Sequence, residues 1–195
     1  MSKKPNITIN KVYTRRGDSG KTELIDQKKV LKSDIRIDCY GEIDELNSSL
    51  GFCISLIDAE SRFDGAKIVS KLKAIQNNLF NLGTVLAISD TSLLDKFPKV
   101  NESDVRALES EIDFYNKDLS DLKSFILPSG CLIGAYLHIC RTTCRRAERR
   151  CVALSEIADI DINALKYLNR LSDLFFVLSR WINKKLGYSE DLWKP

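Results

Sequence analysis

The stretch DCYGEIDELNSSLGFCISLID, residues 38–58, decides the fold class. Its apolar residues recur at spacings of three and four, which places them on one face of an α-helix. An amphipathic helix of this length buries that face against neighbouring elements. The stretch therefore predicts a long helix that faces the core, with an apolar stripe of Ile43, Leu46, Leu50, Ile54 and Ile57.

Four further segments carry the same helical periodicity, and they span about 63–88, 101–117, 131–155 and 161–187. Asn101 and Asp161 are residue types that favour N-cap positions, and Gly187 is typical of a helix stop. Between the second and third segments, Thr91 to Pro98 mixes polar residues with a proline and is expected to be a loop. No strand signal is of comparable strength, so the sequence predicts an all-α five-helix bundle.

Length and composition predict one domain, residues 1–195. The chain has 195 residues, of which 44% are hydrophobic, enough to bury one substantial core without requiring a second. Residues of about 11–35 contain Gly17 and Gly20 and little apolar periodicity, so they are expected to form an irregular arm. The helical bundle is expected over about 38–187.

The charge balance and the hydropathy pattern give no support to nucleic acid or a membrane as a partner. The 30 basic and 27 acidic residues give a net charge of +3, which by itself does not favour nucleic acid or an anionic membrane. No segment approaches the roughly 20 apolar residues that a membrane-spanning helix needs. The N-terminus lacks the apolar run of a secretory signal, so we expect a soluble, cytoplasmic protein.

The six cysteines favour packing over metal or redox chemistry. No CxxC pair occurs, and His138 is the only histidine, so no metal site built from cysteine or histidine is expected. Cys140, Cys144 and Cys151 recur at helical spacing, which suits small buried residues in a reducing compartment.

The segment CRTTCRRAERR, residues 140–150, is the most informative motif that can be interpreted without family knowledge. Arg141, Arg145, Glu148 and Arg149 share one helix face because they are separated by four, three and one residues. Three guanidinium groups repel one another there, and one glutamate offsets only part of that repulsion. Two interpretations stay open: a solvated basic face that pairs with acids of a neighbouring helix, or a site for a polyanion.

Two other segments add weaker signals. YTRRGDSGKT, residues 13–22, is a basic, glycine-punctuated segment that is able to wrap phosphates, although it is not a Walker P-loop. On the last helix, Asn169 and Asp173 lie four residues apart, with Arg170 beside them, among large apolar residues. They form a polar spot that suits a nucleotide sugar, or they serve as interhelical hydrogen-bonding groups.

Five segments, taken in order, resemble the signature segments of the PduO-type ATP:cob(I)alamin adenosyltransferases. The likeness runs over about 11–187, and the segments are YTRRGDSGKT, YGEIDELNSSLG, FILPSG, LHICRTTCRRAERR and YLNRLSD. The clearest departure is Ser129, where the family usually has a glycine. The resemblance implies a ferritin-like five-helix bundle that forms a homotrimer, with ATP bound at each subunit interface.

The resemblance also implies residue roles, by matching motif positions. The residues implied for ATP binding are Thr14, Arg15, Gly17, Asp18, Ser19, Gly20, Thr22, Lys32, Arg145, Glu148, Arg149 and Asn169. Phe125 and Phe176 are implied for cobalamin binding. Arg145, Asp44, Arg141 and Phe125 are implied for catalysis, with a salt bridge between Asp44 and Arg141 of different subunits.

In the family reaction, cob(I)alamin attacks C5′ of ATP, and triphosphate leaves. The cobalt is the nucleophile, so no general base is needed, which agrees with a sequence that has one histidine and no evident nucleophile–base pair. Mg²⁺ is expected to enter with ATP. The resemblance further implies an electron-donating reductase and a B12-dependent enzyme that accepts the product.

Two other functions remain open at the level of sequence. A different small ATP-dependent transferase, such as a kinase, is compatible with the same bundle because fold does not fix function. A non-enzymatic helical module that binds nucleic-acid phosphates through its RRAERR face is the other, and the near-neutral total charge argues against it.

Overall fold

The computed structural model describes residues 10, 12–13 and 15–194, and within them the chain is mostly helical. The elements follow the order β1 (Lys21–Glu23), β2 (Lys29–Leu31), α1 (Ile35–Asp58), α2 (Ala66–Leu86), η1 (Thr91–Lys96), α3 (Glu102–Asn116), α4 (Leu132–Ser155) and α5 (Ile162–Lys185). The five α-helices confirm the prediction of an all-α bundle.

The helix ends follow local side-chain chemistry. The Asn101 side chain accepts from the amide of Ser103 at 2.8 Å, and Asp104 accepts from the Asn101 amide, which completes a capping box. Asp161 accepts from the amide of Asn163 at 2.9 Å at the start of α5. Gly187 has a φ of 77°, as expected of a residue that ends a helix. These predicted ends are confirmed.

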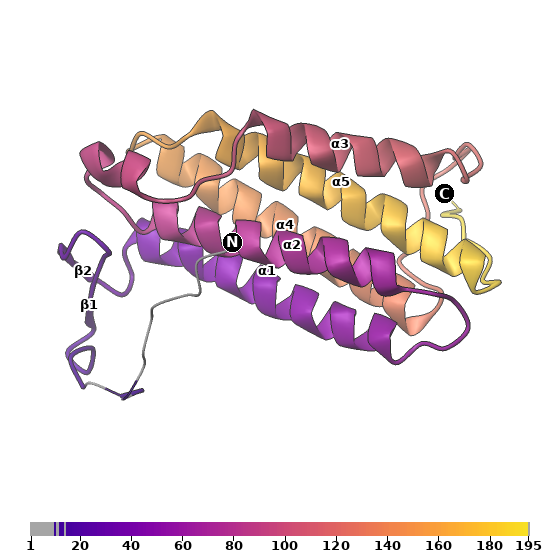
Figure 1. The fold of residues 1–195 in the computed structure, drawn as a ribbon, viewed down its shortest axis with the longest axis horizontal. Helices are drawn as coiled ribbons and strands as arrows, with labels where there is room; N and C mark the ends of the chain where they lie inside the picture. Colours follow the sequence, from indigo (N-terminus) through magenta and orange to yellow (C-terminus); the bar gives the residue numbers. More distant parts are fainter. Residues whose placement is uncertain (1–9, 11, 14, 195) are drawn as a thin grey trace, which may run out of the picture.

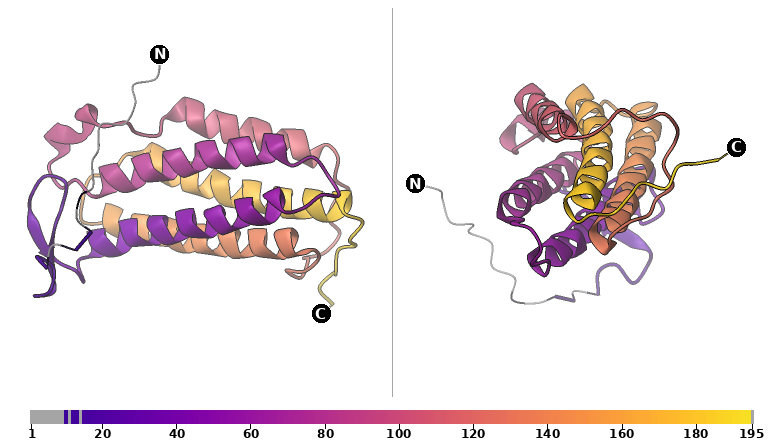
Figure 2. Two further views of the ribbon diagram at one scale, coloured as in Figure 1. Left: turned by 60° about the horizontal axis from the view of Figure 1, so that its bottom comes forward. Right: turned by 90° about the vertical axis from the view of Figure 1, so that its right-hand side faces the viewer.

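Four of the helices form the bundle, and the fifth is attached to its outside. α2 packs on α1, α1 on α4, and α4 on α5, whereas α3 packs on α5. Figures 1 and 2 show α1 and α4 running antiparallel, and α3 running in the same direction as α5. α3 is therefore positioned chiefly by α5.

The core is one continuous apolar cluster built from the predicted stripes. All five apolar residues of the α1 stripe are buried, from Ile43 to Ile57, and Phe175 and Leu178 of α5 are buried with them. Burial of this area supplies the main driving force for the bundle. Among the described residues, no helix is both long and apolar enough to cross a membrane.

Two predictions of irregular structure were wrong in detail. Within the arm, β1 and β2 form an antiparallel hairpin in which Thr22 is opposite Val30. Its strands are three residues long, too short to produce a readable alternation. The expected loop after α2 contains η1, which Asp90 caps by accepting from the amide of Ser92 at 3.0 Å.

Asp26 connects the β1–β2 hairpin to the end of α2 through hydrogen bonds. One of its carboxylate oxygens accepts from the Ser89 amide at 2.7 Å, the Ser89 hydroxyl at 2.7 Å and the Asp90 amide at 2.8 Å. Desolvation raises the pKa of Asp26, but these hydrogen bonds outweigh it and hold the pKa at about 2. The carboxylate thus holds the arm at the end of α2.

Asp26 should therefore contribute stability in a pH-dependent manner. Its folded-state pKa lies below its ordinary value of 3.8, so the contribution is present above about pH 4 and is lost as the pH falls towards 2. Asp26→Asn should lower the unfolding free energy by about 1–2 kcal/mol at pH 6, after allowance for solvent screening. Urea titrations at pH 3–6 will test this, and a difference from wild type that does not shrink towards pH 3 would contradict it.

The cysteines pack as predicted. All six are free and buried. Cys39 and Cys151 bring their sulfur atoms to 3.1 Å of each other between α1 and α4, and the Cys144 thiol donates to the Leu168 carbonyl at 3.2 Å. Burial raises the pKa of the Cys144 thiol, which keeps it protonated and unreactive.

Single replacement of Cys140, Cys144 or Cys151 by alanine should therefore reduce stability without changing the chemistry. Each side chain is 0% exposed, so truncation leaves a small cavity. We expect a loss of about 1 kcal/mol and an unchanged kcat/KM. Thermal unfolding and a turnover assay on the same preparations check this, and a stoichiometric metal in the purified protein would be inconsistent with it.

Candidate active site

The basic segment of α4 contains two kinds of arginine. Arg146 contacts Glu42 and Glu45 of α1 at 2.6 Å each, and Arg150 contacts Asp38 at 3.0 Å. Acids of a neighbouring helix therefore neutralise these two arginines, which lie outside the predicted face of Arg141, Arg145, Glu148 and Arg149. These ion pairs hold α4 against α1.

The other three arginines, which the sequence placed on one face, are not neutralised in this way. Within the described residues, Arg141, Arg145 and Arg149 form no ion pair. The Nε atom of Arg141 is buried without a hydrogen-bond partner. Burial and then the charge of Arg145 lower the pKa of Arg141. This face of α4 therefore carries positive charge that an anion or an external carboxylate would stabilise.

Opposite this face, α5 supplies a polar pair. The Asn169 side-chain amide donates to the Glu148 carboxylate of α4 at 2.9 Å, so these two predicted ATP-binding residues lie together. Asp173, one turn further on, is exposed. Partial burial raises the pKa of Asp173, while Arg170 and Arg145 oppose the rise. Donors, acceptors and free cations thus converge between α4 and α5.

The arm forms a second basic site. A hollow of about 850 Å³ is lined by Arg16, Gly17, Ser19, Lys21, Thr22, Glu23, Lys29 and Lys32. A Cβ atom at Gly17 would stand 3.0 Å from Nζ of Lys32, so the glycine lets the end of this lysine side chain lie close to the backbone of the arm. Arg15 and Gly20 both adopt positive φ, at 61° and 77°. Four cations around one carboxylate make this hollow suited to phosphates.

Some arm residues of the prediction stand apart from this hollow. Arg15 and Asp18 are exposed in the same segment but are not among the residues that line it. Thr14, also predicted for ATP binding, lies outside the described residues. Lys29 also lines the hollow but was not predicted from the sequence. It lies outside the YTRRGDSGKT motif, and only the pairing of β1 with β2 brings it beside Glu23.

Phe125 lies in the connection between α3 and α4. Figure 1 shows this connection at the opposite end of the bundle from the arm. Phe125 is 79% exposed, so it is not part of the apolar core. The ring packs edge-on against Trp193 at 6.2 Å between centroids, and the Phe125 carbonyl accepts from the Trp193 amide at 2.7 Å. An exposed phenylalanine held by the C-terminal segment is available to an apolar ligand.

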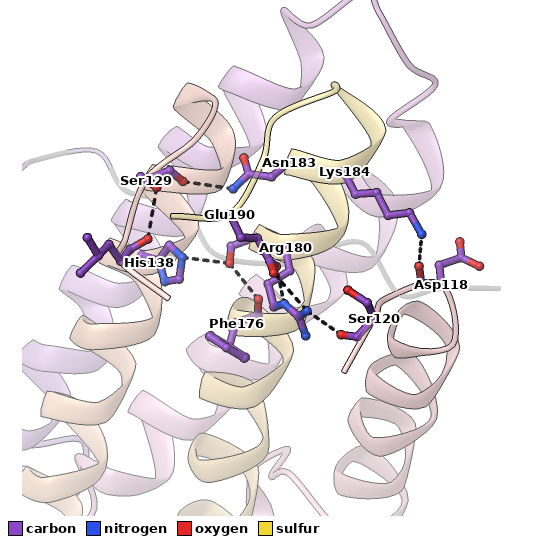
Figure 3. Close-up of polar contacts among 11 residues, drawn as sticks. Asp118, Ser120, Ser129, His138, Phe176, Arg180, Asn183, Lys184 and Glu190 are labelled. Atoms are coloured by element: carbon purple, nitrogen blue, oxygen red, sulfur yellow. Dashed lines mark hydrogen bonds and ion pairs between the residues drawn. The ribbon is translucent and has the colours of Figure 1, made fainter. Parts of the chain in front are cut away.

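Ser129, which stands where the family usually has a glycine, fits into the connection before α4 through hydrogen bonds to nearby residues. The Ser129 hydroxyl donates to Asp191 at 2.9 Å, and its carbonyl accepts from the Asn183 amide at 3.0 Å, a contact drawn in Figure 3. Gly130 carries the positive φ of the turn, 105°, and a Cβ there would stand 2.4 Å from Asn183. The glycine that the turn requires is therefore present.

Phe176 lies between the two ends, on α5. It is half-buried, and its ring lies 6.1 Å from that of His138. Figure 3 shows His138 turned from α4 toward α5, where its Nε2 lies 3.2 Å from the Ser179 hydroxyl. Burial and then the charge of Arg141 lower the pKa of His138 to about 4, so the ring is neutral at pH 7. Phe176 thus borders a neutral imidazole on one side, and the Arg180 guanidinium lies 5.9 Å from the centroid of its ring.

One chain does not bring all the predicted residues together. Asn169 and Glu148 meet, and four of the predicted arm residues line the hollow, but no contact joins the hollow to Arg145 among the described residues. These four are Gly17, Ser19, Thr22 and Lys32. Asp44 is exposed on α1 and forms no ion pair with Arg141 within the same described chain.

A helical bundle with two basic sites and exposed aromatic side chains has the layout of an enzyme that takes a nucleotide polyphosphate and an apolar co-substrate. The family model for cobalamin adenosyltransferase matches residues 12–182. The chain therefore belongs to the cobalamin adenosyltransferase family, and it is an enzyme of the ATP:corrinoid adenosyltransferase type.

Relatives and solved structures agree over nearly the whole chain. The corrinoid adenosyltransferase of Bacillus subtilis is 41% identical over 180 residues, which cover 92% of this chain and 90% of the relative. The cobalamin adenosyltransferase of Cupriavidus metallidurans is 41% identical over 186 residues, 95% of each chain. A variant PduO-type ATP:corrinoid adenosyltransferase from Lactobacillus reuteri, complexed with cobalamin and ATP, superposes with a TM-score of 0.89 at 36% identity and covers 95% of this chain and 100% of that one.

Proposed function

We propose that the chain transfers the 5′-deoxyadenosyl group of ATP to the cobalt of cob(I)alamin. The observation that carries this proposal is the set of arginines on α4 that lack ion pairs, next to the Glu148–Asn169 pair. A triphosphate would neutralise the positive charges of Arg141, Arg145 and Arg149. The nucleoside would form hydrogen bonds with the Glu148–Asn169 pair. Three solved variants of the Lactobacillus reuteri relative are complexed with ATP, two of them with cobalamin also.

In the proposed step, cobalt(I) donates an electron pair to C5′ of ATP. The bond between C5′ and the triphosphate oxygen breaks, and triphosphate leaves with that bond's electrons. No proton transfer is needed, so the protein must align the three atoms and stabilise the charge that develops on triphosphate. Arg145, Arg149 and the cations of the arm perform the second task, with Lys32 and the amides of Gly17 to Thr22 around the phosphates.

The proposed Mg²⁺ ion is held mainly by ATP itself. Mg²⁺ is usually bound through one or two carboxylates together with substrate phosphates. Glu23 is the carboxylate in the lining of the arm hollow, between Lys29 and Arg16, so the donor set fits an ion carried by phosphate oxygens. Mg²⁺ would lower the negative charge on the leaving triphosphate.

We propose that Phe125 and Phe176 seat the corrin. Phe125 is exposed and Phe176 is half-buried, so both rings offer apolar surface, and the His138 ring beside Phe176 is neutral. An apolar seat excludes water from the reacting cobalt, which is a strong nucleophile that water and oxidants consume. A reductase would deliver the electron that forms cob(I)alamin, and a B12-dependent enzyme would receive the product.

We further propose that the whole chain is one domain that works as a cytoplasmic homotrimer. One continuous core supports the single domain, and six free cysteines suit a reducing compartment. The separation of the arm hollow from the α4 face within one chain supports a site shared between subunits. Asp44 of one subunit would then neutralise Arg141 of the next.

Light scattering should accordingly give a trimer at micromolar concentration. Asp44→Asn should weaken assembly and lower ATP use together, because it leaves Arg141 without a counter-charge. Asp38→Asn is the matched control, since Asp38 pairs with Arg150 inside the same chain. A monomer that turns over at the full rate would contradict the shared site.

One experiment tests the proposed function directly. Protein, Mg-ATP and chemically reduced cobalamin are mixed, and the products are analysed for light-sensitive adenosylcobalamin and for triphosphate in equal amounts. Release of ADP in place of triphosphate would favour a kinase-like transferase. Steeply salt-dependent binding of nucleic acid, with no product from ATP, would favour the phosphate-binding module.

A further inference from the structure

An unbroken chain of hydrogen bonds links α3 to the proposed nucleotide site. Nε of Arg170 donates to Glu109 of α3 at 2.9 Å, and Nη1 of Arg170 donates to Oδ1 of Asn169 at 2.5 Å. Nδ2 of Asn169 then donates to Glu148 of α4 at 2.9 Å. Three helices are therefore joined through one amide.

The hydrogen-bonding groups of Arg170 and Glu148 determine the orientation of the Asn169 side-chain amide. Arg170 has only donors, so it must face the oxygen of Asn169, and Glu148 as a carboxylate has only acceptors, so it must face the nitrogen. Within the described part of the chain, no other residue bonds to the second N–H of Asn169 or to the second oxygen of Glu148, so both are available to a ligand. They present one donor and one acceptor side by side.

We propose that Glu109 and Arg170 are positioning residues that hold this donor–acceptor pair in the direction that ATP requires. The inference rests on the proposed function, because it assigns Asn169 and Glu148 to the nucleotide. Glu109 acts on Arg170 by holding its guanidinium group, and Arg170 acts on the Asn169 amide. Neither residue needs to touch ATP.

Stability alone is a weak explanation for this arrangement. The Arg170 and Glu109 side chains are 39% and 45% exposed, and an exposed ion pair contributes little to folding. The same two helices carry a second exposed pair, Lys166 and Glu102, at 3.2 Å and with similar exposure. No hydrogen bond of Lys166 or Glu102 leads to Asn169 among the described residues, so Glu102 provides a matched control.

The test compares Glu109→Gln with Glu102→Gln in the full-length protein. Mg-ATP binding is measured by calorimetry without corrinoid, and KM for ATP and kcat are measured in the transfer assay. Glu109→Gln should weaken ATP binding and raise KM by about threefold to thirtyfold, while kcat at saturating ATP changes little. Glu102→Gln should leave both quantities unchanged.

A double-mutant cycle shows whether Glu109 acts through the amide. In an Asn169→Ala background, Glu109→Gln should have no further effect on ATP binding, because the amide that it positions is gone. Additive effects would overturn the inference, and so would equal ATP affinities for wild type, Glu109→Gln and Glu102→Gln.

The same measurements separate this inference from the proposed function. If wild type binds no Mg-ATP and forms no adenosylcobalamin, the proposed function fails and the positioning role fails with it. If wild type binds and transfers while Glu109→Gln behaves like Glu102→Gln, only the positioning role fails. Far-UV circular dichroism on each variant confirms that the helices are intact.

Discussion

Arg145→Ala and Arg149→Ala should each lower kcat/KM for ATP by about a hundredfold to a thousandfold, by analogy with the loss of one donor to a developing oxyanion. Both side chains are exposed and form no ion pair within the described residues, so their removal costs the fold little. Lysine at either position should restore little activity, because it lacks the planar fork that binds two phosphate oxygens at once.

Arg146→Ala is the matched control for this prediction, because Arg146 lies beside Arg145 but is engaged by Glu42 and Glu45. It should cost some stability and leave kcat/KM for ATP within a few fold of wild type. Far-UV circular dichroism should show unchanged helicity for Arg145→Ala and Arg149→Ala. If both kept the wild-type kcat/KM, the motif would be only a solvated basic face.

The features that the sequence predicted correctly are those that short-range rules determine. The α1 stripe follows from helical spacing, and the caps Asn101 and Asp161 act on amides two residues away. The sequence could not show which arginines of α4 form ion pairs and which do not, because this depends on how α4 packs against α1. Arg146 and Arg145 are adjacent in sequence, yet only Arg146 meets acids of α1.

Contacts between distant elements explain the remaining differences. Glu109 is one of several acids on a polar helix, and its role depends on α3 lying parallel to α5 beside Arg170. Asp26 was overlooked because its partners, Ser89 and Asp90, lie more than sixty residues away at the end of α2. The grouping of Arg145, Glu148 and Arg149 on one helix face was predictable from helical spacing, whereas the assignment of individual residues to ATP rested on the family motifs. Within one chain the α4 face and the arm hollow lie apart.

Phe125→Ala should lower the rate of adenosylcobalamin formation from cob(II)alamin and a mild reductant by about a hundredfold or more, and from ready-made cob(I)alamin by about tenfold. Binding of ATP should change little. The expected difference between the two assays follows from the axial ligand. Cob(II)alamin that keeps its base or a water is hard to reduce, because the axial donor stabilises the oxidised metal relative to cobalt(I).

An aromatic ring blocks the axial position without donating a lone pair, so its removal lets base or water return and lowers the reduction potential. When cob(I)alamin is supplied, the reduction step is bypassed, and only the positioning of cobalt is impaired.

Because the Phe125 side chain is 79% exposed, truncation should change the unfolding free energy by no more than about 0.5 kcal/mol. Phe80→Ala, at another exposed phenylalanine, controls for the loss of surface area. Equal losses from either cobalt state would show that Phe125 has no part in the reduction, and a fall of several degrees in Tm would show that its ring supports the fold through Trp193.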